Sequence, residues 1–518
     1  MKRILRNIFS GYFLVLLLLL AEILLILALQ FLINGYLSLF TDDLNNHVAA
    51  ILVYLGIRLI FFIISLFIFF KIVNRPEDPE FKIPWIVVML LLPFFASILF
   101  LIFGSHGIKK KDQKIINASQ EIYHNIITKN EIKDETNGTF NYLSSTTGLS
   151  LHQNNKINYY KNGETFFPDL IDCLKEAKEF IFMEFFIISD GEIWSQISEI
   201  LKQKADEGVE VRLIYDDMGC GGTITSLTPK LLAKHGIKCY KFHPFRLFLS
   251  SVYNNRDHRK IAIIDHKYGF TGGMNLADEY ANIIKRFGYW KDSMIKIQGS
   301  SINNLIMMFL QNYDIASKQI SDYAKYLNHD YEKYDDEGFV MPFHDGPGAY
   351  VDALVGEQNY INIINYAKKE LYISTPYLIP TYSLLDALRN ASLRGVDVHL
   401  ILPYIPDKKI VYSIAKSHFP YLLKAGVKIH FYKPGFNHMK SIIADKELAF
   451  VGTINFDFRS LVHHFECGAT IYKNSCLFDI QKDFDEMIEQ SILVSQDFKL
   501  KLITRTFCSV VKIFTPLL

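Results

Sequence analysis

One short pattern occurs twice in this chain at a fixed separation, and it limits the folds that the chain can adopt. The pattern is His-x-Lys-x-x-x-x-Asp, and each copy is followed by a small-residue turn that ends in Asn. Its members are His258, Lys260, Asp265 and Asn275 in the first copy, and His438, Lys440, Asp445 and Asn455 in the second. Every member recurs at the same offset (438 − 258 = 180). A repeat of this length indicates two copies of one domain and not a solenoid of short units.

The residues around the two patterns predict alternating helices and strands. In the first copy, helices are expected over 166–179 and 193–207, and apolar strands over 180–187 and 209–215. The second copy repeats this order, with helices over 360–369 and 384–393 and strands over 371–375 and 396–402. Units of this kind form buried sheets flanked by helices. We therefore expect two tandem α/β domains, over 156–330 and 331–518, related by a pseudo-twofold axis.

The residue types in the pattern suit attack on a phosphodiester. Residues two apart in a strand share a face, so His and Lys of each copy should point into one cleft while the Asp ends the strand at a turn. Two lysines and two asparagine amides can stabilise the negative charge that develops on the phosphate oxygens without a metal. One neutral imidazole can attack phosphorus, and a second, protonated imidazole can donate a proton to the leaving alcohol. Each copy thus supplies half of one active site.

These motifs resemble the paired signature of the phospholipase D superfamily, and within it the chain is similar to the bacterial cardiolipin synthases over nearly its whole length. Other matching stretches are 74–85 (NRPEDPEFKIPW), 255–260 (NRDHRK), 272–280 (GGMNLADEY), 374–377 (STPY), 432–438 (YKPGFNH) and 455–460 (NFDFRS). The resemblance implies two phospholipase D-like domains that convert two phosphatidylglycerol molecules to cardiolipin and glycerol. It implies membrane phospholipids as partners, a phosphohistidine intermediate, and no cofactor.

The resemblance also implies residue roles. His258 is expected to be the nucleophile, because the N-terminal copy often plays that part in relatives, and His438 the general acid and base. Lys260, Lys440, Asn275 and Asn455 should hold the phosphate, whereas Asp265 and Asp445 should fix the motif turns. Glu466 and either Asp278 or Glu279, of which we take Glu279, match family acids that orient the imidazoles. A surface salt bridge is the alternative for these acids.

The first hundred residues have a different character. Three apolar runs cover 11–33, 48–70 and 83–103, and each is long enough for a helix to cross a bilayer. We expect a transmembrane region with two to three helices over 1–108, then a polar connector over 109–155. Lys2, Arg3 and Arg6 place the N-terminus in the cytoplasm, while the basic cluster 109–114 places the catalytic domains there. The N-terminus and the catalytic domains can both be cytoplasmic only if one of the three runs does not cross the membrane. If all three runs cross, the N-terminus lies outside. We expect a multi-pass cell-membrane protein with cytoplasmic catalytic domains.

Charge and composition narrow the alternatives. A net charge of +1 provides no field for nucleic acid, so a membrane-bound nuclease is disfavoured and a phospholipase D-type hydrolase is the main alternative to transfer. Six scattered cysteines without a CxxC pair indicate reduced thiols. His463-His464-x-Glu466 has ligand-type residues but no third ligand at a suitable spacing, so no metal site is expected. The apolar end 507–518 is expected either on the bilayer or as a buried terminal element. The oligomeric state stays open.

Overall fold

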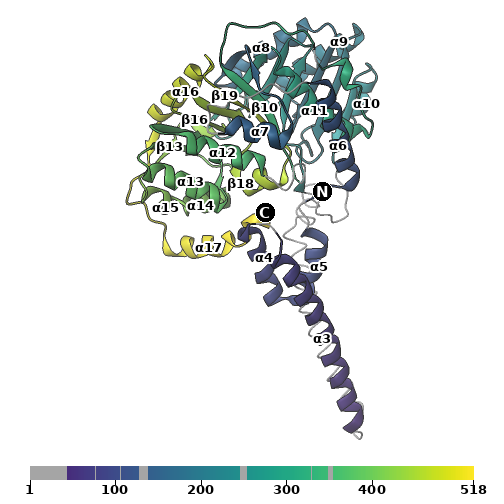
Figure 1. Cartoon of the computed structure of the whole chain (residues 1–518), viewed down its shortest axis with the longest axis vertical. Coiled ribbons are helices and arrows are strands. Elements are labelled where there is room, and N and C mark those ends of the chain that lie inside the picture. The colour runs from purple at the N-terminus through teal and green to yellow at the C-terminus, as the bar shows by residue number, and fades with distance from the viewer. Residues whose placement is uncertain are drawn as a thin grey trace. The chain divides into compact units, whose positions relative to one another are not determined.

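The computed structural model describes residues 44–75, 78–104, 107–127, 138–244, 254–327, 329–347 and 354–517. The chain divides into two compact units, one made mainly of residues 1–105 and the other mainly of residues 106–516. Figure 1 colours the chain from purple in the N-terminal unit to yellow at the C-terminus.

The described residues of the N-terminal unit form the helices α3 (Leu44–Val73), α4 (Pro79–Leu91) and α5 (Pro93–Phe103). The apolar run 11–33 lies outside the described residues, and the run 48–70 forms part of α3. The run 83–103 does not form one helix as expected, because Pro93 lacks the N–H that would continue α4 and begins α5 instead. By combined length and hydropathy, no helix in the described part of the chain qualifies as a membrane span. The two to three spans expected over 1–108 are therefore not seen there.

The first repeat is built on a seven-stranded sheet with the order β2-β9-β7-β6-β3-β4-β5. The strands are β2 (Lys156–Tyr160), β3 (Phe180–Phe185), β4 (Glu210–Asp216), β5 (Lys238–Phe242), β6 (Lys260–Ile264), β7 (Tyr268–Gly272) and β9 (Met294–Gln298). Its helices are α8 (Gly163–Glu176), α9 (Glu192–Asp206), α10 (Thr228–Ala233) and α11 (Ile302–Ser317). β3 is buried along its whole length, as its continuous apolar run predicts for a strand covered on both faces.

The second repeat has a nine-stranded sheet with the order β1-β10-β19-β17-β16-β11-β13-β14-β20. The strands are β1 (His152–Gln153), β10 (Phe339–Asp345), β11 (Glu370–Ser374), β13 (Asp397–Pro403), β14 (Lys428–Tyr432), β16 (Ser441–Ala444), β17 (Leu448–Gly452), β19 (Glu466–Tyr472) and β20 (Ser491–Leu493). Its helices are α12 (Val355–Tyr366), α13 (Tyr382–Leu393), α14 (Lys409–Lys416), α15 (Phe419–Leu423), α16 (Leu477–Glu489) and α17 (Leu502–Lys512). The seven strands from β10 to β14 match the first sheet position by position.

The expected α/β fold with two equivalent sheets is therefore confirmed, and the repeats lie side by side, blue to teal against green to yellow (Figure 1). The stretch 109–155 differs from a simple connector. It forms α6 (Lys110–Ile126) and α7 (Thr139–Thr147), and then β1, which pairs with β10. A segment that precedes the first repeat thus completes the sheet of the second. His152 in β1 is buried, and its ring contacts Ser300 and Asn304 of the first repeat.

Candidate active site

The two motif histidines lie where the repeats meet. His258 precedes β6 by two residues, and His438 lies shortly before β16. The backbone N–H of His258 donates to the carbonyl of Phe465 (2.8 Å), and that of His438 donates to the carbonyl of Lys291 (2.7 Å). Beside His438, the short strands β8 (Tyr289–Lys291) and β15 (Gly435–Asn437) pair in parallel across the interface. Each histidine is therefore fixed to the backbone of the other repeat.

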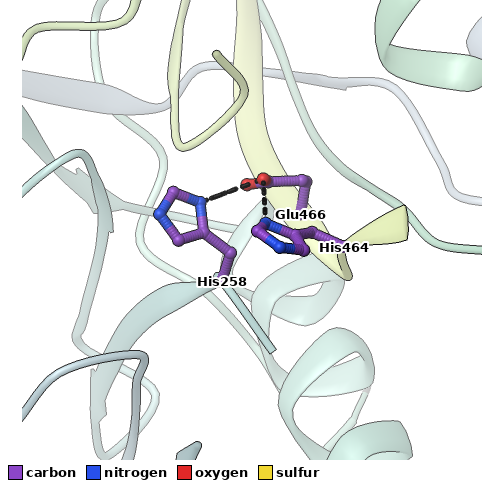
Figure 2. Close-up of side chains that lie close together, drawn as sticks. All are labelled: His258, His464 and Glu466. Carbon is purple, nitrogen blue, oxygen red and sulfur yellow. Dashed lines mark hydrogen bonds and ion pairs between the residues drawn. The ribbon is translucent and has the colours of Figure 1, made fainter. Parts of the chain in front are cut away.

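Each imidazole also contacts a carboxylate from the other repeat. Nδ1 of His258 lies 2.9 Å from both oxygens of Glu466, and Nδ1 of His438 lies 2.6 Å from Oδ2 of Asp292. Figure 2 shows the ring of His258 directed toward the Glu466 carboxylate. A carboxylate at Nδ1 holds the proton on that nitrogen and turns Nε2 toward a substrate as the reactive atom. The histidines, lysines and acids thus converge from both repeats on one site.

The carboxylate that contacts His438 belongs to Asp292. The structure does not place Glu279 or Asp278, which the sequence suggested for this role, against His438. The carboxylate of Asp278 instead accepts the backbone N–H groups of Glu192 and Ile193 at the start of α9. Asp292 is the counterpart of Glu466, because the residue after each acid accepts a hydrogen bond from Gly273 or Thr453, which are 180 positions apart. Asp292 lies 17 residues after its motif Asn (292 − 275), whereas Glu466 lies 11 after its own (466 − 455). Because these two separations differ by six residues, the fixed offset of 180 between the repeats does not relate Asp292 to Glu466.

The two acids sit in differently shaped surroundings. A Cβ at Gly273 would lie 2.0 Å from Oδ1 of Asp292, so the glycine makes room for this carboxylate. Its counterpart Thr453 donates its hydroxyl to Glu466. The two repeats therefore place a carboxylate beside the histidine with different residue pairs, Gly273 with Asp292 and Thr453 with Glu466.

The two motif lysines are fully buried within the site. Nζ of Lys260 donates to the carbonyl of His258 (2.6 Å), and Nζ of Lys440 lies 2.6 Å from Nδ1 of His438 and 3.6 Å from Asp292. Burial lowers the pKa of Lys260 to about 8 and that of Lys440 to about 7. Burial thus outweighs the nearby Glu466 and Asp292 in its effect on the lysine pKa values, and a bound anion would stabilise the charged form of both lysines.

Both imidazoles are held in the neutral form. Burial lowers the pKa of His258 well below its usual value, and the charges of Lys260 and Lys440 lower it further. Burial and then Lys440 lower the pKa of His438 to about 4, even though Asp292 opposes the shift. Burial raises the pKa of Asp292, but Lys440 and His438 outweigh burial, so the net pKa falls and the carboxylate stays ionised. A neutral imidazole with a free electron pair is the form that can attack phosphorus.

The motif asparagines are engaged in local structure. Nδ2 of Asn275 donates to the hydroxyl of Tyr280 (2.7 Å), and its Oδ1 accepts the N–H of Ile187 (2.9 Å). Nδ2 of Asn455 donates to Oγ of Ser460 (3.0 Å), while its Oδ1 has no hydrogen-bond partner among the residues described. Each amide nitrogen still carries a second N–H, so direct contact with a phosphate remains a proposal.

The motif aspartates lie at the other end of the same strands. Asp265 accepts the backbone N–H groups of residues 178–180, and Asp445 accepts those of residues 368–370. Both take a positive φ (51° and 52°), a conformation that Asp tolerates in turns. Their geometry suits the turn-fixing role and not contact with a substrate.

One group of potential metal ligands is present within the described residues. His258, His464 and Glu466 each offer a ligand atom, and these atoms lie within 4.8 Å of one another (Figure 2). The third ligand that the sequence did not reveal is His258, which comes from the other repeat. A cation there would displace the His258–Glu466 hydrogen bond and meet the charges of Lys260 and Lys440.

The two sheets are equivalent, and the motif histidine of each repeat contacts a carboxylate of the other repeat. This arrangement defines a two-repeat phospholipase D-like protein. The family model described as "Cardiolipin synthase, PLD-like domain" matches residues 170–303 and 360–488, and a "Phospholipase_D-nuclease N-terminal" model matches residues 60–105. The chain belongs to the cardiolipin synthase, PLD-like domain family.

Individual relatives agree with this assignment. "Cardiolipin synthase 2" of Bacillus anthracis is 33% identical over 470 residues, which cover 88% of this chain and 90% of that protein. An "Uncharacterized protein" of Streptococcus mutans is 42% identical over 460 residues, covering 86% of this chain and 98% of its own. The crystal structure of phosphatidylserine synthase from Haemophilus influenzae has a TM-score of 0.55 at 15% identity and covers 74% of this chain and 98% of that one. That structure supports the fold alone.

Proposed function

We propose that the chain is a cardiolipin synthase that transfers a phosphatidyl group between two phosphatidylglycerol molecules, giving cardiolipin and glycerol. The observation that carries the proposal is the pair of imidazoles, each held at Nδ1 by a carboxylate of the other repeat beside two buried lysines. This arrangement presents a nucleophile and a proton carrier to one anionic phosphate. Relatives of matching length that are named cardiolipin synthase supply the choice of substrate.

In the first step, Nε2 of His258 attacks the phosphorus of a phosphatidylglycerol bound between Lys260 and Lys440. The bond from phosphorus to the glycerol headgroup oxygen breaks, and His438 gives its proton to that oxygen, so glycerol leaves. The bound phosphate supplies the negative charge that favours a protonated His438, since the low pKa of this imidazole arises from burial and the nearby Lys440. Glu466 stabilises the positive charge on His258 as the phosphorus–nitrogen bond forms.

In the second step, the glycerol hydroxyl of another phosphatidylglycerol attacks the phosphohistidine. Neutral His438 accepts the hydroxyl proton, the phosphorus–nitrogen bond breaks, and cardiolipin forms. Both histidines return to their starting states, so the reaction is balanced and reversible. Water in place of the second lipid would give phosphatidic acid by the same steps.

We also propose that the N-terminal unit attaches the enzyme to the cell membrane, with the catalytic unit in the cytoplasm. α3 exposes large apolar side chains, among them Leu52, Leu59, Phe62 and Phe67, each more than half exposed. An apolar surface of this kind needs a lipid or protein environment. The basic cluster 109–114, which follows this unit, supports the cytoplasmic side. Labelling a cysteine introduced near Lys110 in intact cells tests the orientation, and labelling by an impermeant reagent would overturn it.

The reaction is tested by incubating purified protein with phosphatidylglycerol labelled in the headgroup and separately in the acyl chains. Labelled cardiolipin and free glycerol in equal amounts are expected. Phosphatidic acid without cardiolipin would make the protein a hydrolase, and no turnover of any phospholipid would overturn the proposal. His258→Ala and His438→Ala should each abolish cardiolipin formation, because each removes one half of the site.

A further inference from the structure

We propose that α17 and the start of α14 form an interfacial face that docks the catalytic unit on an anionic lipid bilayer. This face is defined by Leu502, Ile503, Phe507 and Val510 on α17, by Ile410 on α14, and by Lys408, Lys409, Lys499, Lys501 and Arg505. The proposal rests on the proposed function for its biological purpose, since it states how a lipid substrate meets the site.

The apolar side chains of α17 are directed to one side and left in solvent. Ile503, Phe507 and Val510 are spaced i, i+4 and i+7, which places them on one face of the helix. Ile503 is 86% exposed and Leu502 76% exposed. The opposite side holds the helix in place, because Cys508 is buried and its Sγ contacts the carbonyl of Ser413 on α14 (3.4 Å). The helix is therefore docked through one side with its apolar side unpartnered within the described structure.

The exposed charges beside this apolar side are mainly positive, and the two acids nearest in the sequence are Asp407, which pairs with Lys408 (3.6 Å), and the exposed Asp497. Lys499, Lys501 and Arg505 are exposed beside it, and residues 498–518 contain neither Asp nor Glu. Lys408 and Lys409 are exposed at the start of the adjoining α14, next to Ile410, which is 59% exposed. Apolar side chains flanked by lysine and arginine match a bilayer surface that is apolar inside and anionic at its headgroups.

A second copy of the chain fits this face less well. A symmetric dimer would bring the same surface of both copies together. The cations of α17 would then face mostly cations, because the segment 498–518 contains no acid and the nearby Asp407 already pairs with Lys408. An anionic membrane pairs with all of them at once.

The face is tied to the active site at two points. Nζ of Lys408 lies 3.1 Å from the hydroxyl of Tyr377, and the charge of Lys408 reaches His258. After α17, the carbonyl of Pro516 contacts Nε2 of His463 (3.4 Å), which directly precedes His464. A bilayer on this face would therefore contact elements that also contact the neighbourhood of His258 and His464.

Insertion is tested with an environment-sensitive fluorophore on Ile503→Cys in the full chain, with the partly accessible Cys239 replaced by Ser. The matched control carries the same label on Glu199→Cys of α9, an exposed site away from the face. Vesicles of phosphatidylglycerol should shift the emission of the Ile503 label to the blue, and vesicles of phosphatidylcholine should do so much less. No shift with phosphatidylglycerol, or an equal shift of the Glu199 label, would overturn the proposal.

The functional test compares Ile503→Glu with Phe478→Glu, which places the same charge on α16, at the far side of the second repeat from α17 (Figure 1). Phe478 is 74% exposed, so both changes are tolerated by the fold. Ile503→Glu should lower turnover of vesicle phosphatidylglycerol by about tenfold, from lost apolar burial and added anionic repulsion. Turnover of a monomeric short-chain phosphatidylglycerol should stay unchanged in both variants.

The outcomes separate the face from the chemistry. Unchanged vesicle turnover in Ile503→Glu would overturn the docking face while leaving the transferase intact. Wild-type protein that fails on both the short-chain and the vesicle substrate would overturn the proposed function instead. A change in sedimentation of Ile503→Glu from dimer to monomer, without vesicles, would assign the face to a second copy and overturn the bilayer.

Discussion

Asp292 and Glu466 are the residues on which the orientation of the two histidines depends. Asp292→Asn keeps the shape of the side chain but removes the charge that holds the proton on Nδ1 of His438. Because proton transfer by a positioned imidazole contributes about 100- to 10,000-fold, we expect kcat to fall by at least about 100-fold. Glu279→Gln, which changes the acid that the sequence favoured, should leave kcat within about twofold. Steady-state kinetics on short-chain phosphatidylglycerol compare the two variants. An equal loss of kcat in both would mean that Glu279 also acts in the active site.

The pKa values of the buried lysines predict an unusual pH profile. Lys440 and Lys260 have pKa values lowered to about 7 and about 8, so the free enzyme loses its phosphate-binding charges as the pH rises through this range. The first step needs a protonated His438, whose pKa in the free enzyme is lowered to about 4, and a neutral His258, whose pKa is also lowered. We therefore expect kcat/KM for the donor lipid to fall as the pH rises from about 5, and to fall more steeply above about pH 8, where both lysines also lose their charge.

The decline of kcat/KM above about pH 8 should come mainly from a rise in KM for the donor lipid. A bound phosphate raises the pKa of both lysines, so kcat at saturating lipid should change less over the same range. Initial rates with monomeric short-chain lipid avoid the surface pH of a charged bilayer. A kcat/KM that rises through pH 7 to 9 would mean that a group other than these lysines controls binding.

At the level of secondary-structure elements, Asp265 and Asp445 join the start of β3 or β11 to the end of β6 or β16. Each carboxylate accepts three backbone N–H groups, so replacement by Ala leaves these donors without their partner. We expect Asp265→Ala to lower the free energy of unfolding by about 2 kcal/mol and the melting temperature by several degrees. The kcat of the folded fraction should stay within about twofold, because the aspartate lies at the opposite end of β6 from His258.

Scanning calorimetry with Asp172→Ala as the control checks this prediction. The side chain of Asp172 is 71% exposed and pairs only with Lys175 on the same helix, so its removal should change the melting temperature by less than about one degree. Loss of kcat in Asp265→Ala without loss of stability would place this aspartate in the chemistry.

The same elements show what the sequence can predict. The sequence predicts the motif strands β6 and β16 and the first two helices and strands counted from α8 and from α12, because their periodicity is strong and occurs twice. Asp292 was missed, because the longer link after Asn275 breaks the offset on which the comparison depended. β1 was missed because two residues carry no periodicity, and its pairing with β10 depends on a contact across nearly 190 positions (340 − 152 = 188). The break at Pro93 was visible in the sequence but was outweighed by the apolar run around it.

At the scale of the whole catalytic unit, neither repeat contains a complete active site. His258 needs Glu466 from the second repeat, and His438 needs Asp292 from the first. The backbone contacts of the two histidines cross in the same way. Any change that separates the repeats should therefore remove both orienting acids at once, and this interdependence explains why the pattern must occur twice.

The two halves of the site differ, because Asp292 and Gly273 occupy the positions that Glu466 and Thr453 occupy in the other half. This difference helps to decide which histidine attacks phosphorus. Glu466 contacts His258 through both oxygens and takes a further hydrogen bond from Thr453, so it is fixed to stabilise a lasting positive charge on His258. Asp292 contacts His438 through one oxygen, beside Lys440, which suits an imidazole that exchanges its proton in each step. The two environments thus favour His258 as the nucleophile.

A donor lipid with a p-nitrophenyl headgroup tests this assignment, because its leaving group needs no proton. His438→Ala should then release about one equivalent of p-nitrophenolate per protein in a burst and accumulate a phosphatidyl group on His258, since the second step lacks its base. His258→Ala should give no burst. Mass spectrometry of the acid-labile adduct identifies the labelled histidine. An adduct on His438 in the His258→Ala protein, with no burst from His438→Ala, would reverse the two roles while leaving the two-histidine reaction in place.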